Sequence, residues 1–172
     1  MNKNYMAGMA LFALTHSMAA QATQTEQCLS VAQAEALVTY VLPTLVEASR
    51  NKCSASLPAT APLLKENSEQ LAKYRAASND AWPKAKGAVS VLAGEKLPPE
   101  IDDTLLRPIA DAMFSKLVGD EIKPKDCSLI DKIYSDLEPM PSANLASLAI
   151  TIMQAATKDG KKQDIPICKA PA

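Results

Sequence analysis

The stretch DDTLLRPIADAMFSKLV, residues 102–118, decides the fold class, because it carries the strongest amphipathic pattern in the chain. Its apolar residues recur three and four positions apart, the spacing that gathers side chains on one face of an α-helix. They are Leu105, Leu106, Ile109, Ala110, Met113, Phe114, Leu117 and Val118. We predict a helix here that bends at Pro108 or begins later than residue 102, with Gly119 as its C-cap.

A helix is also predicted on the N-terminal side, over 31–50. Ser30 and Gln33 stand three residues apart, which is the capping-box pattern at a helix start. An apolar face follows at helical spacing, and Pro43 lies inside it. Because proline removes a backbone donor, we expect a kink at this position within a helix that continues beyond it.

The segment 62–94 lies between these two helices and repeats its apolar residues every seven positions. Trp82-Pro83 interrupts the pattern, and Asn79 or Asp80 could cap a new helix there. The sequence therefore leaves open one kinked helix or two helices in series.

A short helix is predicted through 129–137, on the C-terminal side of the deciding stretch. Asp126 or Ser128 would cap it, and Asp131 stands at the capping-box position from Ser128.

The last helix is expected to follow Ser142 as its cap, and a lysine-rich tail begins at about residue 158. Proline-rich loops separate all of these segments. We predict an all-α fold over residues 23–172: a single bundle of five or six helices.

Composition agrees with a helical bundle. The chain has 172 residues, of which 48% are hydrophobic, enough to build a core. Only five residues are glycine and 4% are aromatic, a composition that argues against a strand-rich fold. The formal net charge of -1 gives no electrostatic basis for binding nucleic acid.

Residues 1–22 have the pattern of a secretory signal peptide: Lys3, then an apolar run over 6–14, then small residues. Ala20-Gln21-Ala22 fits a cleavage site before Thr23, and two other sites lie just upstream. We expect an exported chain, periplasmic or extracellular, without a transmembrane segment after cleavage.

Four cysteines would remain in the mature chain: Cys28, Cys53, Cys127 and Cys168. An exported environment favours two disulfides. Cys28 and Cys53 bracket a predicted helix roughly 30 Å long, whereas disulfide Cα atoms come within about 7 Å, so these two should not pair. In an up-and-down bundle Cys53–Cys127 with Cys28–Cys168 is favoured, and Cys28–Cys127 with Cys53–Cys168 stays open.

The inventory of reactive side chains is sparse. The single histidine, His16, would leave with the signal peptide, which excludes histidine-based catalysis and histidine metal sites in the mature chain. The grouped carboxylates are explained by helix termini and turns: Glu100, Asp102, Asp103, Asp120 and Glu121. We therefore predict no catalytic residues, no metal ligands and no cofactor.

Two sets of residues are candidates for binding. Trp82, Tyr40, Tyr74 and Tyr134 lie on or beside apolar faces, where they would fill the core or line an apolar ligand pocket. The second set is cationic and would face an anionic surface or form a solvated loop and tail: Lys123, Lys125, Lys158, Lys161, Lys162 and Lys169.

The function best supported by these patterns is that of an exported, non-enzymatic helical protein that binds or scaffolds a protein or another component of the cell envelope. The alternative is a carrier of a small apolar ligand between the helices. An enzyme that uses carboxylates is a third hypothesis.

Overall fold

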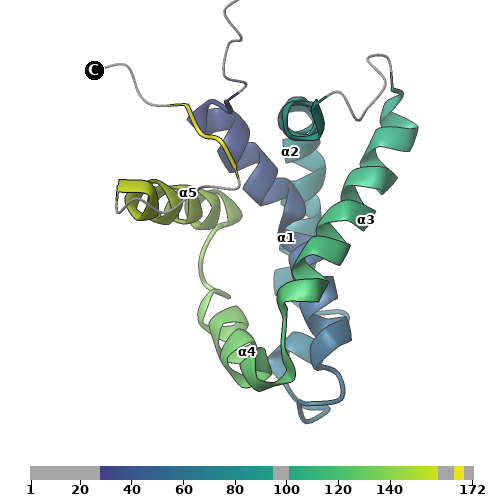
Figure 1. The fold of residues 1–172 in the computed structure, drawn as a ribbon. Coiled ribbons are helices and arrows are strands. Elements are labelled where there is room, and N and C mark those ends of the chain that lie inside the picture. Colours follow the sequence, from purple (N-terminus) through teal and green to yellow (C-terminus); the bar gives the residue numbers. More distant parts are fainter. Residues whose placement is uncertain (1–27, 95–100, 159–164, 169–172) are drawn as a thin grey trace, which may run out of the picture.

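The computed structural model describes residues 28–94, 101–158 and 165–168, and within them it confirms an all-α bundle (Figure 1). The bundle contains two disulfides. The helices are α1 (Val31–Cys53), α2 (Glu69–Ala93), α3 (Asp103–Glu121), α4 (Cys127–Asp136) and α5 (Ser142–Lys158). In the described parts of the connections lie the 3-10 turns η1 (Pro62–Leu64) and η3 (Pro124–Asp126). The predicted signal peptide lies outside the described residues.

Helix α1 is the centre of the bundle, and α2, α3 and α5 pack on it more than on one another. Ser78 and Arg75 of α2 bond to Tyr40 and Glu47 of α1, so α2 runs antiparallel to α1. Helix α3 runs parallel to α1, since Asp111 contacts Tyr40 and Gly119 approaches Lys52 farther along. Helix α5 lies across α1 (Figure 1).

The predicted capping box at the start of α1 is confirmed. The backbone N–H of Gln33 donates to Ser30 Oγ, and Gln33 Oε1 accepts from the backbone N–H of Ser30. The helix continues through Pro43, which cannot donate to the carbonyl of Thr39. Beside that break, Ser78 Oγ of α2 donates to the carbonyl of Tyr40 at 2.7 Å, which ties the two helices together.

The segment 62–94 does not form a helix throughout, and the predicted start at residue 62 is wrong. Pro62 begins a single 3-10 turn, and the chain becomes extended at Lys65. The helix starts only where Ser68 Oγ accepts the backbone N–H of Leu71. From there α2 is one helix through Pro83, so no new helix starts at Asn79 or Asp80.

Helix α3 begins at the predicted place, with Asp102 as its N-cap, and continues through Pro108. The prediction of Gly119 as C-cap is wrong, because the helix ends at Glu121 and Gly119 is buried inside it. A Cβ on Gly119 would lie 3.2 Å from Lys52 Cε of α1. This glycine therefore permits close packing of two helices and does not end one.

The cap predictions for the last two helices also need correction. Helix α4 starts at Cys127, directly after η3, so Ser128 lies inside it. Asp126 is the N-cap residue, but its side chain makes no capping hydrogen bond. Asp131 instead accepts the backbone N–H of Leu63 at 2.9 Å and fixes η1 against α4. Ser142 is the first residue of α5, not the residue before it.

The core consists of two clusters. The first joins α1, α2, α3 and α5 and includes Leu37, Ala85, Ala110 and Ile150. The second lies between the C-terminal half of α1, η1, the start of α2 and α4. Its members are Leu42, Val46, Cys53, Leu63, Leu71, Tyr74, Cys127 and Tyr134.

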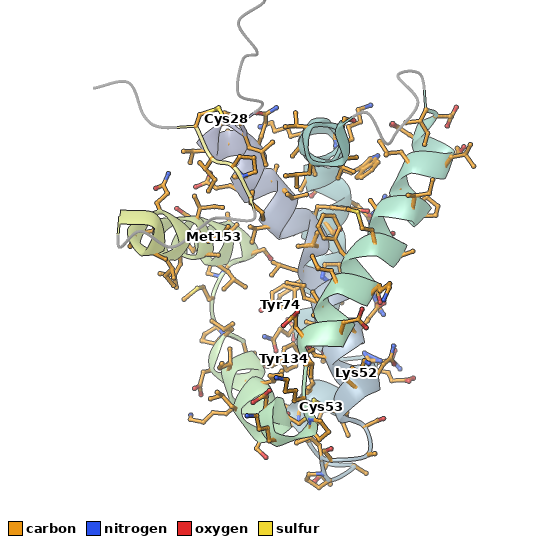
Figure 2. All side chains as sticks on the ribbon, in the orientation of Figure 1. Cys28, Lys52, Cys53, Tyr74, Tyr134 and Met153 are labelled. Carbon is orange, nitrogen blue, oxygen red and sulfur yellow. A yellow bond between two sulfur atoms is a disulfide. The ribbon has the colours of Figure 1, made fainter. Side chains whose placement is uncertain are left out.

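The favoured disulfide pairing, Cys53–Cys127 with Cys28–Cys168, is confirmed. Figure 2 shows Cys28 and Cys53 at opposite ends of α1, which is why these two cannot pair. Cys53–Cys127 is buried and joins the end of α1 to the start of α4. Cys28–Cys168 holds residues 165–168 beside residue 29, where the N–H of Leu29 donates to the carbonyl of Pro166.

Candidate functional site

The four candidate aromatic residues are all buried, and they separate into two places. Tyr40 and Trp82 pack in the first core cluster, with ring centroids 4.8 Å apart. Tyr74 and Tyr134 belong to the second cluster, where Figure 2 shows them close to each other beside Cys53. The four therefore do not line one common cavity.

Tyr74 and Tyr134 have their polar atoms satisfied inside the core. Gln70 Nε2 donates to the hydroxyl of Tyr74 at 2.9 Å and to the carbonyl of Tyr134 at 2.8 Å. The Tyr134 hydroxyl shares a 2.8 Å hydrogen bond with Ser68 Oγ. Burial raises the pKa of Tyr134, so its hydroxyl stays protonated at neutral pH. These contacts fix α4 against the start of α2.

Tyr40 and Trp82 support a polar cavity on the surface of the first cluster. This cavity, which we call the polar groove, has a volume of about 260 Å³. Helices α1, α2 and α3 all contribute residues to its lining. The lining residues are Pro43, Thr44, Glu47, Arg75, Ser78, Asn79, Arg107 and Asp111.

Arg107 is held at the groove by two kinds of contact. Its guanidinium carbon lies 5.8 Å from the ring centroid of Tyr40 and 5.6 Å from that of Trp82, within the range of cation–π attraction. Its Nη2 donates to Asn79 Oδ1 at 2.5 Å across the groove. The buried aromatic pair therefore acts as a platform that orients a cation.

Asp111 is held by Tyr40. The Tyr40 hydroxyl donates to Asp111 Oδ1 at 2.5 Å and also lies 3.3 Å from the carbonyl oxygen of Arg107. Burial first, and then the bond to Asp111, raise the pKa of Tyr40 far above its usual value, so the hydroxyl remains a donor. The other charges in the groove are Glu47 and Arg75, whose Oε1 and Nη2 atoms form a 2.8 Å ion pair.

A second feature is an exposed row of large apolar side chains along α3. Leu105, Ile109, Met113 and Leu117 are four residues apart, with exposed fractions of 61%, 48%, 42% and 61%. Consecutive members lie next to each other on the helix surface, and the row is about 18 Å long at about 1.5 Å per residue. We call this row the α3 apolar face.

The α3 apolar face ends in a surface pocket of about 550 Å³ between α3 and α4. Leu117 belongs to both features, and Val118, Ile122 and Ile130 complete the apolar lining. Its charged lining residues are both acidic. They are Glu121 and Asp126, and we call this cavity the end pocket.

The predicted cationic residues are only partly placed. Lys123 and Lys125 are exposed beside η3, and Lys125 lies in that turn. The Lys158 side chain and all of Lys161, Lys162 and Lys169 fall outside the described residues.

The predicted carboxylates mostly serve helix ends and surface ion pairs. Asp102 accepts the N–H of Thr104 at 2.7 Å, and Asp103 pairs with Lys86 at 3.1 Å. Asp120 pairs with Lys116 at 2.6 Å. Glu121 instead lines the end pocket, and Glu100 lies outside the described residues.

Sequence reasoning missed Asp111, whose contacts depend on a tyrosine 71 residues away. The α3 apolar face, by contrast, had a signal in the sequence. Two adjacent apolar stripes follow α3, and only the stripe with Leu106, Ala110 and Phe114 is buried.

Within the described residues, no helix combines the length and apolar character needed to cross a membrane. In the same part of the chain, no group of three or more acidic, cysteine or histidine side chains is arranged to hold a metal ion.

Comparisons with models of protein families, with curated proteins and with solved structures found no match to this chain.

Proposed function

We propose that this chain is an exported, non-enzymatic binding protein whose α3 apolar face receives an amphipathic helix of a partner protein. The observation that carries the proposal is the continuous exposed row from Leu105 to Leu117, which leads into the end pocket. Contiguous apolar surface with a polar surround is typical of interaction sites. A row with i, i+4 spacing matches the apolar stripe of a second helix.

Burial of the α3 apolar face alone contributes too little free energy for a stable complex, so the partner needs contacts beyond an apolar stripe. Complete burial of a large apolar side chain contributes about 1.5–3 kcal/mol, and the four side chains are already roughly half buried, so they offer about 3–6 kcal/mol in total. Much of this is offset by the entropy lost on association. The end pocket must therefore contribute to any stable complex.

The charges of the end pocket indicate the partner's chemistry. Glu121 and Asp126 line a cavity that is otherwise apolar. A helix with a Lys or Arg at the end that reaches this cavity would complement both carboxylates, whereas an acidic residue there would be repelled. The predicted partner is therefore an apolar-striped helix with a basic end.

Export is part of the proposal and rests on the signal-peptide pattern together with the two disulfides. The chain recovered from the periplasm or medium should begin at or near Thr23. Mature protein that retains Met1 would contradict export.

We favour this function over the carrier hypothesis because Tyr40 with Trp82 and Tyr74 with Tyr134 fill separate parts of the core. An enzyme that uses the grouped carboxylates gains no support either, since Asp102, Asp103 and Asp120 occupy a cap and surface ion pairs.

The test uses two synthetic helical peptides of about 18 residues that share a leucine stripe of i, i+4 spacing. One carries two lysines at one end, and the other carries two glutamates there. Titration calorimetry with the oxidised protein should give tighter binding of the lysine peptide. Met113→Glu should weaken that binding by about ten-fold or more, because it places a charge in the middle of the contact.

Ile152→Glu is the matched control, since it also replaces an exposed large apolar residue with glutamate, but on α5. It should leave the affinity within about two-fold of the parent. The proposal is wrong if neither peptide binds, or if both variants weaken binding equally. Circular dichroism of each variant verifies that the bundle is intact.

A further inference from the structure

The polar groove holds equal numbers of positive and negative side chains, contributed by three helices. Arg75 and Arg107 are its cations, and Glu47 and Asp111 are its anions. An ordinary solvated surface holds such groups loosely. Here Arg107 rests on a buried aromatic platform, and Asp111 is bonded to a buried tyrosine hydroxyl. The two groups are therefore fixed in advance of any ligand.

Both fixed groups retain unused bonding capacity toward the groove. Asp111 uses Oδ1 for Tyr40, and the described residues supply no donor to its second carboxylate oxygen. Arg107 uses Nη2 for Asn79 and also interacts with the Tyr40 hydroxyl, and a guanidinium with five N–H donors keeps others for a ligand. The acceptor, Asp111, and the donor, Arg107, thus lie about one helical turn apart on α3.

We propose that the polar groove binds a small zwitterion, a compound with one ammonium and one carboxylate group, of which an α-amino acid is the simplest case. The ligand's ammonium donates to Asp111, and its carboxylate accepts from the free N–H groups of Arg107. Arg75 and Glu47 close the groove at its other end with their own ion pair. The site is independent of the proposed docking of a partner helix.

Size and charge limit the class of ligand. The groove volume of about 260 Å³ lies slightly below the usual range for drug-sized ligands, which suits a compound of the size of an amino acid. A simple anion would be attracted by the arginines but repelled by Asp111 and Glu47. A simple cation would be attracted by the two carboxylates but repelled by the two arginines. Only a ligand with both charges satisfies the fixed pair together.

The test is an NMR titration of the ¹⁵N-labelled, oxidised full mature chain with four probes. Glycine and L-serine are zwitterions, whereas acetate and methylammonium each carry one of the two charges. The signals of Asn79, Arg107 and Asp111 should shift saturably with glycine or serine. Binding of acetate and methylammonium should be weaker by about ten-fold or more.

Asp111→Asn is the decisive variant, because an asparagine oxygen can still accept from Tyr40 but carries no charge. It should weaken zwitterion binding by about ten-fold and reduce the discrimination against acetate. Asp120→Asn, at an exposed carboxylate of the same helix, should change neither. The absence of saturable shifts with all four probes up to about 10 mM, or equal affinities for glycine and acetate, would overturn the proposal.

The two proposals fail separately. Met113→Glu changes the α3 apolar face and should leave glycine binding intact, because Met113 does not line the polar groove. Loss of glycine binding in this variant would show that the NMR shifts of the groove residues do not report binding in the groove, and would overturn the proposed site.

Discussion

The double variant Cys53→Ala/Cys127→Ala is expected to destabilise the protein strongly. The disulfide joins residues 74 positions apart, and closing a loop of that length removes about 4 kcal/mol of chain entropy from the unfolded state. Both sulfur atoms are also buried in the second core cluster, so the alanines leave unfilled space there. The expected loss in the free energy of unfolding is therefore about 4–5 kcal/mol.

The matched comparison is Cys28→Ala/Cys168→Ala. This bond spans 140 residues, but with Cys53–Cys127 intact it closes an effective loop of about 66 residues, close to the 74 of the other bond, so loop closure alone does not separate the two. Its sulfurs are only partly buried. Residues 165–168 give the first core cluster only the partly buried Ile165 and Ile167, so we expect their release to remove few core contacts. We expect this variant to lose less stability than the first.

Urea unfolding measures the difference. At a slope of about 2 kcal/mol per molar urea, the Cys53→Ala/Cys127→Ala midpoint should fall by about 2 M. A shift corresponding to less than about 1 kcal/mol would refute the loop-closure reasoning. A larger loss for the Cys28→Ala/Cys168→Ala variant would show that the C-terminal clamp, and not the α1–α4 bond, is the main covalent support.

Three further predictions concern single side chains. Arg50 buries Nε and Nη2 without hydrogen-bond partners among the described residues, which costs stability. Arg50→Met should therefore raise the free energy of unfolding by about 1–2 kcal/mol, and a lower value in urea unfolding would contradict this. Tyr40→Phe removes the bond to Asp111 and should cost about 1.5–3 kcal/mol, a cost that should shrink in an Asp111→Asn background of a double-mutant cycle. The hydrogen bond from the backbone N–H of Thr104 lowers the pKa of the Asp102 carboxyl in the folded protein, so the stability that this bond contributes is complete above the unfolded pKa and is lost as the pH falls through the folded pKa. Asp102→Asn should therefore flatten the curve of unfolding free energy against pH below about pH 4, and an unchanged curve would contradict this cap.

The features that sequence reasoning predicted correctly depend on local patterns or on simple length arguments. The Ser30 capping box needs only residues three positions apart, and helix periodicity identified α1, α3 and α5. The disulfide pairing followed from one length, since α1 separates Cys28 from Cys53. None of these predictions required knowledge of which faces touch.

The features it missed depend on tertiary contacts. Gly119 has the local appearance of a C-cap, but Lys52 of α1 packs over it and the helix continues. Asp131 has the position of a capping-box residue, but it accepts from Leu63 of η1. The polar groove likewise exists only because α1 brings Tyr40 between two other helices.

The α3 apolar face is the central feature of this account, and methyl NMR tests it most directly. The ¹³C-methyl signals of Ile109, Met113 and Leu117 should shift saturably when the lysine-ended helical peptide is added to the oxidised protein, while those of Leu148 and Ile152 on α5 should stay in place. Saturable shifts confined to the α5 methyls, or no saturable shift on α3, would contradict the account.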